Sequence, residues 1–286
     1  MGYRFNIDEW LPRLPLEPEY GRFSGEIVTS PCHICSNEHL RREAHDQFDW
    51  GPAVPVDVFI MAEGEPPDRH VTKIGGLPYR PAQMPWPTAE SGTPMSFLAQ
   101  IDFTDSRDLT GELPGDVLLV FTPDGNDCIE TLHLEWQPLG LKEPILPEQV
   151  PEQAWRPTPC FGHACRTVSY PEAQEKPEIS ANKYPLCRGL EIWSSFHLLQ
   201  YQATQIGSAP FFIQPDDDQL PGRMLCAISS VQPSSHEPYP WVNRSEPRMA
   251  KDEWRYDDGY FMLGDVGCIY ISIDETGQLH YGWSCY

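Results

Sequence analysis

Short apolar runs separated by turn-forming residues dominate the chain, and this pattern predicts β-strands rather than helices. The runs at 55–61, 96–103, 116–121 and 267–273 have strand length, and residues 129–136 alternate between apolar and polar side chains as a half-exposed strand does. The chain also holds 31 prolines, which interrupt helices. The sequence therefore predicts a mainly β fold with few short helices.

Three short sequence motifs, which we call words, occur twice in the same order. They are KIGGLPY at 73–79 and QIGSAPF at 205–211, FLAQI at 97–101 and MLCAI at 224–228, and GDVLLVF at 115–121 and GDVGCIY at 264–270. Repeats in a fixed order indicate the duplication of a structural unit. We therefore expect two pseudo-repeated antiparallel β-rich halves packed into one globular unit.

The repeats divide the chain into four stretches that we expect to form one compact domain. Residues 1–70 are an N-terminal extension with a CxxC knuckle, 71–137 the first β-rich repeat, 138–203 a proline-rich connection with a Cys/His cluster, and 204–286 the second repeat. The second repeat carries a polar, aromatic insertion over 231–259. Long loops of this kind often carry function.

Acidic residues outnumber basic ones by 42 to 20, which gives a formal net charge of −22. Such a charge repels nucleic acids and anionic membranes, so neither is an expected partner. The N-terminus has no apolar region of a secretory signal, and no run reaches the ~18 apolar residues of a membrane span. The sequence thus predicts a cytoplasmic protein, whose acidity serves either solubility or the capture of a basic protein.

The nine cysteines allow three interpretations in a compartment where disulfides are rare. They are small buried apolar residues, a redox CxxC without the usual βαβ setting, or ligands of one structural zinc ion. Zinc takes four thiolate or imidazole ligands at the corners of a tetrahedron. The best four zinc ligands are Cys32, Cys35, Cys160 and Cys165, with His163 and Cys187 as alternates.

Catalytic signatures are missing from the sequence. It contains no GxSxG, HExxH, GxxxxGK or GxGxxG motif, which are the spacings that support nucleophilic, zinc-dependent, phosphate-binding and dinucleotide-binding chemistry. We therefore assign no catalytic residue, and the sequence favours a protein that is not an enzyme.

The words GGLPYRP, GTPMSFLAQIDF and LPGDVLLVF in the first half, with GDVGCIYISI and YGWSCY at the end, resemble those of the YwqG-like family of bacterial proteins, a domain of unknown function. The resemblance covers residues 71–121 well and 204–286 more loosely. It implies a mainly β architecture of two related halves and no established reaction. Members of the family have been proposed as immunity or interaction proteins.

Two functions follow as hypotheses. The first is binding of a basic protein, such as a toxin domain neutralised by an immunity protein, through an acidic face that includes the insertion. Aromatic residues favoured as interface anchors lie there: Tyr239, Trp241, Trp254 and Tyr256. The alternative is a small-molecule or carbohydrate-binding protein, or an enzyme of unrecognised type, with a cleft between the halves lined by Tyr79, Trp86 and Phe211.

Overall fold

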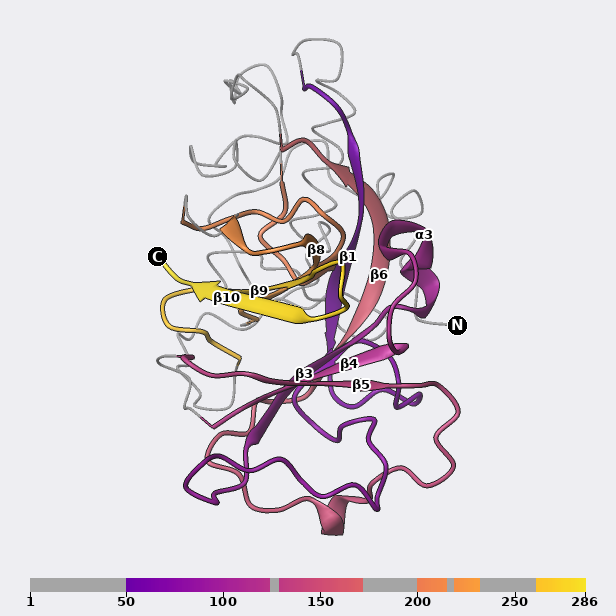
Figure 1. Ribbon diagram of the computed structural model, residues 1–286, viewed down its shortest axis with the longest axis vertical. Coiled ribbons are helices and arrows are strands. Elements are labelled where there is room, and N and C mark those ends of the chain that lie inside the picture. The colour runs from indigo at the N-terminus through magenta and orange to yellow at the C-terminus, as the bar shows by residue number, and fades with distance from the viewer. Residues whose placement is uncertain (1–49, 124–128, 172–199, 215–218, 232–260) are drawn as a thin grey trace, which may run out of the picture.

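A computed structural model describes residues 50–123, 129–171, 200–214, 219–231 and 261–286. These residues form one ten-stranded sheet in the order β10-β9-β8-β7-β1-β6-β2-β3-β4-β5, in which every pair of neighbours is antiparallel. Figure 1 shows the strands of the first half below those of the second, with β1 and β6 running between them. The expected mainly β fold is confirmed.

The strands are β1 (Val54–Glu63), β2 (Lys73–Ile74), β3 (Ser96–Asp102), β4 (Val117–Thr122), β5 (His133–Gln137), β6 (Cys160–Ser169), β7 (Gln205–Ile206), β8 (Arg223–Ser229), β9 (Cys268–Ile273) and β10 (Leu279–Ser284). The helices of the described ranges are η3 (Thr104–Ser106), α3 (Arg107–Thr110) and η4 (Pro147–Gln149). Each is about one turn long, and none of them has the length and apolarity that a membrane crossing requires.

The two halves exchange their long strands. In the chain β1 precedes β2, yet it pairs with β7 of the second half, whereas β6 precedes β7 and pairs with β2 of the first. The two long strands also pair with each other along their full length, from Val54↔Ser169 to Glu63↔Cys160. Neither half can therefore separate from the other without breaking the central pairing, which explains why both belong to one unit.

Equivalent backbone hydrogen bonds show that the halves are repeats. Gly75 N donates to Leu98 O at 2.7 Å, and Gly207 N donates to Leu225 O at 2.9 Å. The β3–β4 pair has a register shift between Phe97 and Ala99. The β8–β9 pair has one at the equivalent place, between Met224 and Cys226. The first two repeated words therefore occupy matching positions in the sheet.

The third pair of words matches the strand pairing only if one word is shifted by two residues relative to the other. In the sheet Asp102 pairs with Val117, and the equivalent Ser229 pairs with Cys268. By strand pairing Val117 thus corresponds to Cys268, whereas an alignment of the words GDV at 115–117 and 264–266 matches Val117 to Val266. The second half has two additional residues in this turn, and Val266 adopts a positive φ of 51° there. Because a shift of two keeps every side chain on its face, the apolar pattern does not reveal it.

One hydrophobic core lies on the inner face of the curled sheet, and both halves contribute matching side chains to it. Leu98, Ile101 and Leu118 of the first half correspond to Leu225, Ile228 and Ile269 of the second, and all six are fully buried. The outer faces carry separate clusters, one around Phe97, Leu119 and Phe121 and the other around Ala227, Cys268 and Tyr270.

One expectation about local structure differs from what the structure shows. The stretch 138–203, expected as a connection, contributes the ten-residue strand β6, which pairs with β1, the strand expected at 55–61. Prolines on both sides of β6 hide this strand, because they interrupt the periodicity by which strands are recognised.

Candidate binding site at the two sheet edges

The strand β10 ends the sheet on one side, and its backbone has an open edge. Asp274 N donates to Gln278 O at 3.0 Å, which sets the pattern of the β9–β10 hairpin. The backbone groups of the even-numbered residues of β10 therefore bond to β9. The N–H and C=O groups of Leu279, Tyr281 and Trp283 therefore point away from the sheet. No other described residue hydrogen-bonds to these groups.

The strand β5 ends the sheet on the other side in the same way. Phe103 N donates to Asp116 O at 2.9 Å, which directs the even-numbered residues of β4 toward β3 and the odd-numbered ones toward β5. The backbone groups of Leu134 and Trp136 consequently point outward, and within the described ranges they too have no hydrogen-bond partner.

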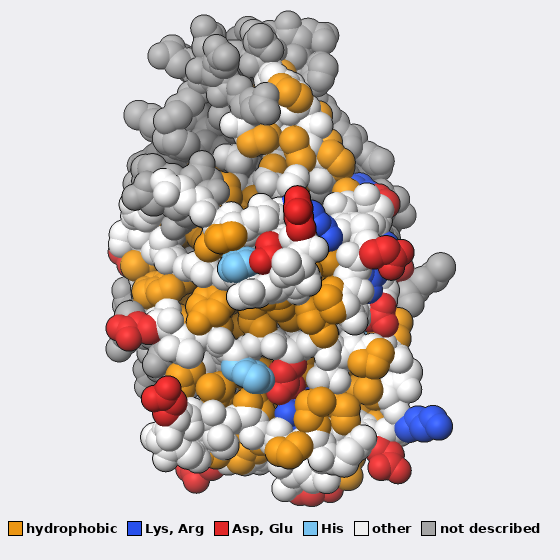
Figure 2. All heavy atoms as spheres, in the orientation of Figure 1, with side chains coloured by type: hydrophobic (Ala, Val, Ile, Leu, Met, Phe, Trp, Pro, Cys, Tyr) orange, Lys and Arg blue, Asp and Glu red, His pale blue; other side chains and the backbone are white. Residues whose placement is uncertain are grey.

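The same five residues direct their side chains toward the shared core and are only partly buried. We call this set, Leu134, Trp136, Leu279, Tyr281 and Trp283, the edge seam. The two edges approach each other at one end of it, where the Tyr281 hydroxyl accepts a hydrogen bond of 3.1 Å from Leu132 N. Figure 2 shows hydrophobic side chains gathered on the face between the positions that β10 and β5 have in Figure 1.

The two edges carry the same motif. Phe121 pairs with His133 in the first half, and the equivalent Ser272 pairs with His280 in the second. Accordingly His133 corresponds to His280 and Trp136 to Trp283, so each edge strand holds His-x-x-Trp in the same register. The two indoles lie at equivalent positions of the seam, in two halves whose sequences otherwise differ widely.

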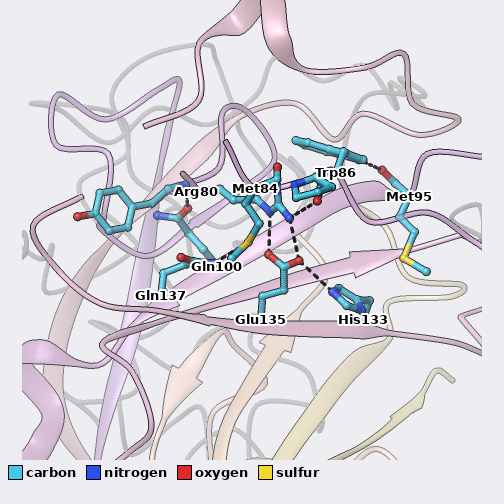
Figure 3. Close-up of polar contacts among 10 residues, drawn as sticks. Arg80, Met84, Trp86, Met95, Gln100, His133, Glu135 and Gln137 are labelled. Carbon is cyan, nitrogen blue, oxygen red and sulfur yellow. Dashed lines mark hydrogen bonds and ion pairs between the residues drawn. The ribbon is translucent and has the colours of Figure 1, made fainter. Parts of the chain in front are cut away.

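A buried arginine fixes the outer face of β5. The Arg80 guanidinium, of which 1% of the side chain is exposed, binds the Glu135 carboxylate through Nε–Oε2 at 2.7 Å and Nη2–Oε1 at 3.1 Å. It also donates to Met84 O at 2.7 Å and to Pro85 O at 2.5 Å. Figure 3 shows the guanidinium between Glu135 and the loop that carries Met84 and Trp86. One side chain therefore anchors this loop to the edge strand.

Each edge histidine lies beside a carboxylate. His133 Nε2 is 3.0 Å from Glu135 Oε1, and His280 Nε2 is 2.9 Å from Asp274 Oδ2. Burial raises the pKa of Glu135, but hydrogen bonds from Arg80 and His133 outweigh it and hold the pKa below its usual value. Hydrogen bonds from Thr276 and then His280 lower the pKa of Asp274. Both carboxylates are thus charged at neutral pH.

The repeated glycine word of the first half encloses a second buried cation. Lys73, with 1% of its side chain exposed, donates to Leu77 O and to Glu65 Oε2, the latter at 3.0 Å. Leu77 N donates to the other oxygen of Glu65 at 2.6 Å. A Cβ on Gly76 would lie 1.8 Å from Glu65 Oε1, so only glycine leaves room for the carboxylate. Burial lowers the pKa of Lys73, while Glu65 opposes that effect.

The predicted zinc ligands fall into two groups. Cys32, Cys35 and Cys187 lie outside the described residues. Cys160 and Cys165 are both on β6, five residues and hence about 16 Å apart, and they point to opposite faces of the sheet. Two thiolates of one zinc ion lie within about 4 Å of each other. At most one of them can therefore take part while β6 keeps this strand geometry.

A zinc site stays a prediction under this restriction. His163, the alternate ligand on β6, shares the face of Cys165. The described residues by themselves hold no group of three or more His, Cys, Asp or Glu side chains placed to bind a metal ion.

The predicted aromatic contacts lie in different places. Tyr79 and Trp86 pack in the outer cluster of the first half, where the Tyr79 hydroxyl accepts from Leu141 N at 2.9 Å and Trp86 Nε1 donates to Met95 O at 2.8 Å. Phe211 lies in the second half, and its carbonyl accepts from the Tyr270 hydroxyl at 3.1 Å. The insertion residues Tyr239, Trp241, Trp254 and Tyr256 lie outside the described ranges.

The arrangement is suited to binding an extended chain. Backbone donors and acceptors alternate along both edges, and indole and phenol side chains lie between them. Neither 129–137 nor 261–286 contains a lysine or arginine, whereas these two stretches hold five acidic residues: Glu130, Glu135, Asp265, Asp274 and Glu275. Arg80 compensates the charge of Glu135, so the seam is apolar at its centre and its negative margin consists of the other four carboxylates.

The fold and these edges define a class of β-rich proteins built from two strand-exchanged repeats. Within that class the chain belongs to the DUF1963 family, a domain of unknown function, whose family model matches residues 72–277. A comparison with curated proteins finds no match. The family assignment thus agrees with the expectation of an uncharacterised domain and assigns no activity.

Sequence reasoning overlooked the edge strands as a site, although a signal was present. The words HLEW at 133–136 and HYGW at 280–283 repeat at nearly the same spacing as the words GDV at 115–117 and 264–266. The buried Arg80–Glu135 pair had no comparable signal, because its partners are 55 residues apart and nothing local links them.

Proposed function

We propose that this protein is a cytoplasmic, YwqG-like binding module without enzymatic activity, and that it recognises a positively charged protein. The observation that carries the proposal is the unequal distribution of charge between interior and surface. Lys73 and Arg80 are buried, and Arg166 is held by Asp57 at 2.7 Å and Asp108 at 2.6 Å. Arg107 is held by Asp116 at 2.8 Å.

Four of the eight lysine and arginine residues in the described ranges therefore take part in ion pairs, and only Lys142, Arg156, Arg166 and Arg223 are exposed. Exposed carboxylates are far more numerous. The exposed acidic residues are Glu65, Asp68, Glu90, Asp108, Glu112, Glu130, Glu143, Glu148, Glu152, Asp265 and Glu275. An anionic surface steers cationic partners to itself and disfavours anionic ones. The surface is consequently more acidic than the composition suggests, which supports a basic partner.

A basic toxin domain neutralised by this chain is the specific case that we favour. Neutralisation needs no chemistry from the binding protein, since covering a cationic active surface suffices. The described residues support this role through their charge and through the open edge seam. A cleft for a small molecule or carbohydrate receives less support, because the polar groups of Tyr79 and Trp86 are already engaged in internal hydrogen bonds.

The proposal is tested by titrating the purified protein against the products of neighbouring genes that have a pI above about 9. An acidic protein of similar size serves as the control. We expect binding of the basic partner only, with an affinity that falls at least about tenfold between 50 and 200 mM salt, because screening weakens exposed charge pairs. Equal binding of the acidic control, or an affinity that salt does not change, would contradict a charge-directed binding module.

A further inference from the structure

We propose that the edge seam binds its partner by β-strand addition: an extended segment with alternating apolar and basic residues pairs antiparallel with the open edge of β10. This inference deepens the proposed function and rests on it, since the segment belongs to the basic protein partner. The four observations that carry it are the open edges, their lack of protection, the partly exposed indoles and the surrounding carboxylates.

Among the described residues, the open edges lack three common forms of protection against pairing with other chains. Natural edge strands are often guarded by lysine, proline or a β-bulge, among other devices. Neither β5 nor β10 contains lysine or proline, and neither the β4–β5 nor the β9–β10 register shifts. In this sheet the register shifts occur in the interior pairs β3–β4 and β8–β9. An unguarded edge favours strand pairing with another chain, which here provides the binding mode.

The β10 edge offers the longer set of backbone groups. Leu279, Tyr281 and Trp283 present their N–H and C=O groups outward, whereas β5 presents those of Leu134 and Trp136. Because all nine pairings within the sheet are antiparallel, the added strand is expected to follow the same pattern. Its bonded residues then lie directly opposite those three and share their face of the sheet.

The seam selects the side chains of the added strand. Residues that bond to β10 direct their side chains inward, where Trp283 and Tyr281 lie on one side and Trp136 on the other. These positions require apolar residues. The intervening positions point to the outer face, where Asp274 and Glu275 follow β9 and attract lysine or arginine. The seam therefore recognises the pattern basic-apolar-basic-apolar, which combines strand geometry with positive charge.

The test uses the synthetic peptide Lys-Val-Lys-Val-Lys-Val-Lys, with blocked ends and a fluorescent label, in an anisotropy titration of the full chain. One derivative carries N-methyl groups on the three valines and another on three lysines. Each has the same charge and the same number of methyl groups. We expect valine methylation to weaken binding by at least about tenfold, because it removes the donors that face β10, and lysine methylation to change it less than about threefold.

A protein variant provides the complementary test. Leu279→Pro removes one outward N–H at the first residue of β10, where proline is tolerated, and Leu279→Val retains that N–H as the matched control. We expect weaker peptide binding for the proline variant only. Should Leu279→Pro fail to fold, which its thermal unfolding reveals, the methylated peptides decide the matter with the unaltered protein.

The outcomes separate this inference from the proposed function. Salt-sensitive binding that both methylated peptides retain equally would overturn strand addition and leave a charge-directed binding module. Equal losses with both derivatives would also overturn it, because antiparallel pairing with a single edge distinguishes alternate residues. Failure of the peptide to bind, while a basic protein partner binds, would overturn the assignment to the seam. If neither binds, the proposed function itself is wrong.

Discussion

The buried pair of Arg80 and Glu135 should behave as one energetic unit, and a double-mutant cycle measures this. In Arg80→Met the Glu135 carboxylate, with 14% of its side chain exposed, loses its two guanidinium contacts. In Glu135→Met the guanidinium, 1% exposed, loses its only carboxylate partner among the described residues. Breaking one side of such a pair costs about 3 kcal/mol or slightly more, because a charge stays buried without compensation.

The double variant should cost no more than Arg80→Met alone, which loses the same backbone and ring contacts and in addition leaves Glu135 without its guanidinium partner. The double variant leaves no isolated charge, and what is lost is the pair of hydrogen bonds to Met84 O and Pro85 O, at about 1 kcal/mol each, with a contact of Arg80 to the Trp86 ring at 5.9 Å worth about 1 kcal/mol. The sum is about 3 kcal/mol, against about 6 kcal/mol for two independent changes. Urea unfolding followed by circular dichroism measures the free energy of unfolding of the wild type, the two single variants and the double variant.

Additive losses of stability would refute the reasoning. They would mean that the two groups are solvated separately and that the Arg80 loop is not anchored through Glu135. A free energy of unfolding for the double variant within about 1 kcal/mol of either single variant would support the pair as described.

Acid should weaken the same pair. The pKa of Glu135 is lower in the folded protein than in the unfolded chain, where it is near 4.3. The stabilisation is therefore fully present above the unfolded pKa and is lost as the pH falls through the folded pKa. Melting temperatures measured between pH 7 and pH 3 should decrease less for the double variant than for the wild type. Equal decreases would show that Glu135 does not contribute to acid sensitivity.

Two further predictions concern space and burial. Gly76→Ala should cost more than the roughly 1 kcal/mol expected for Gly92→Ala, although both glycines have positive φ. A Cβ at position 76 meets Glu65 at 1.8 Å and displaces this carboxylate from the buried Lys73, whereas one at position 92 meets nothing within 4 Å. Equal losses in urea unfolding would contradict this explanation. Burial raises the pKa of the Cys226 thiol, so a thiol reagent should modify the half-buried Cys285 well before Cys226 in the native protein. Mass spectrometry of the modified protein measures both rates. Comparable rates at the two cysteines would contradict the buried position of Cys226.

The sequence alone predicts much of the fold. The runs at 96–103 and 267–273 are strands β3 and β9 within one or two residues, and the words at 73 and 205 begin matching backbone paths. Both successes rest on local information, since strand periodicity and turn glycines act within a few residues. The third repeated word was placed two residues out of register, because a period of two cannot detect that shift.

The candidate site was less accessible from sequence. Cys160 and Cys165 looked like neighbours in a metal cluster, but the strand conformation of β6 separates them. The role proposed for Trp136 and Trp283 depends on their both lying on terminal strands of the sheet, and nothing within either strand indicates that. A strand is interior or terminal according to its partners, which are chosen by the whole chain.

Local patterns were therefore enough to define a β-rich chain with two related halves, because apolar periodicity and turn residues express preferences of short segments. Three other features arise only when distant segments meet. They are the strand exchange between β1 and β6, the enclosure of Arg80 beside Glu135 and the open edges of β5 and β10. These features depend on register and burial across 50 residues or more, and short-range preferences carry no information about either.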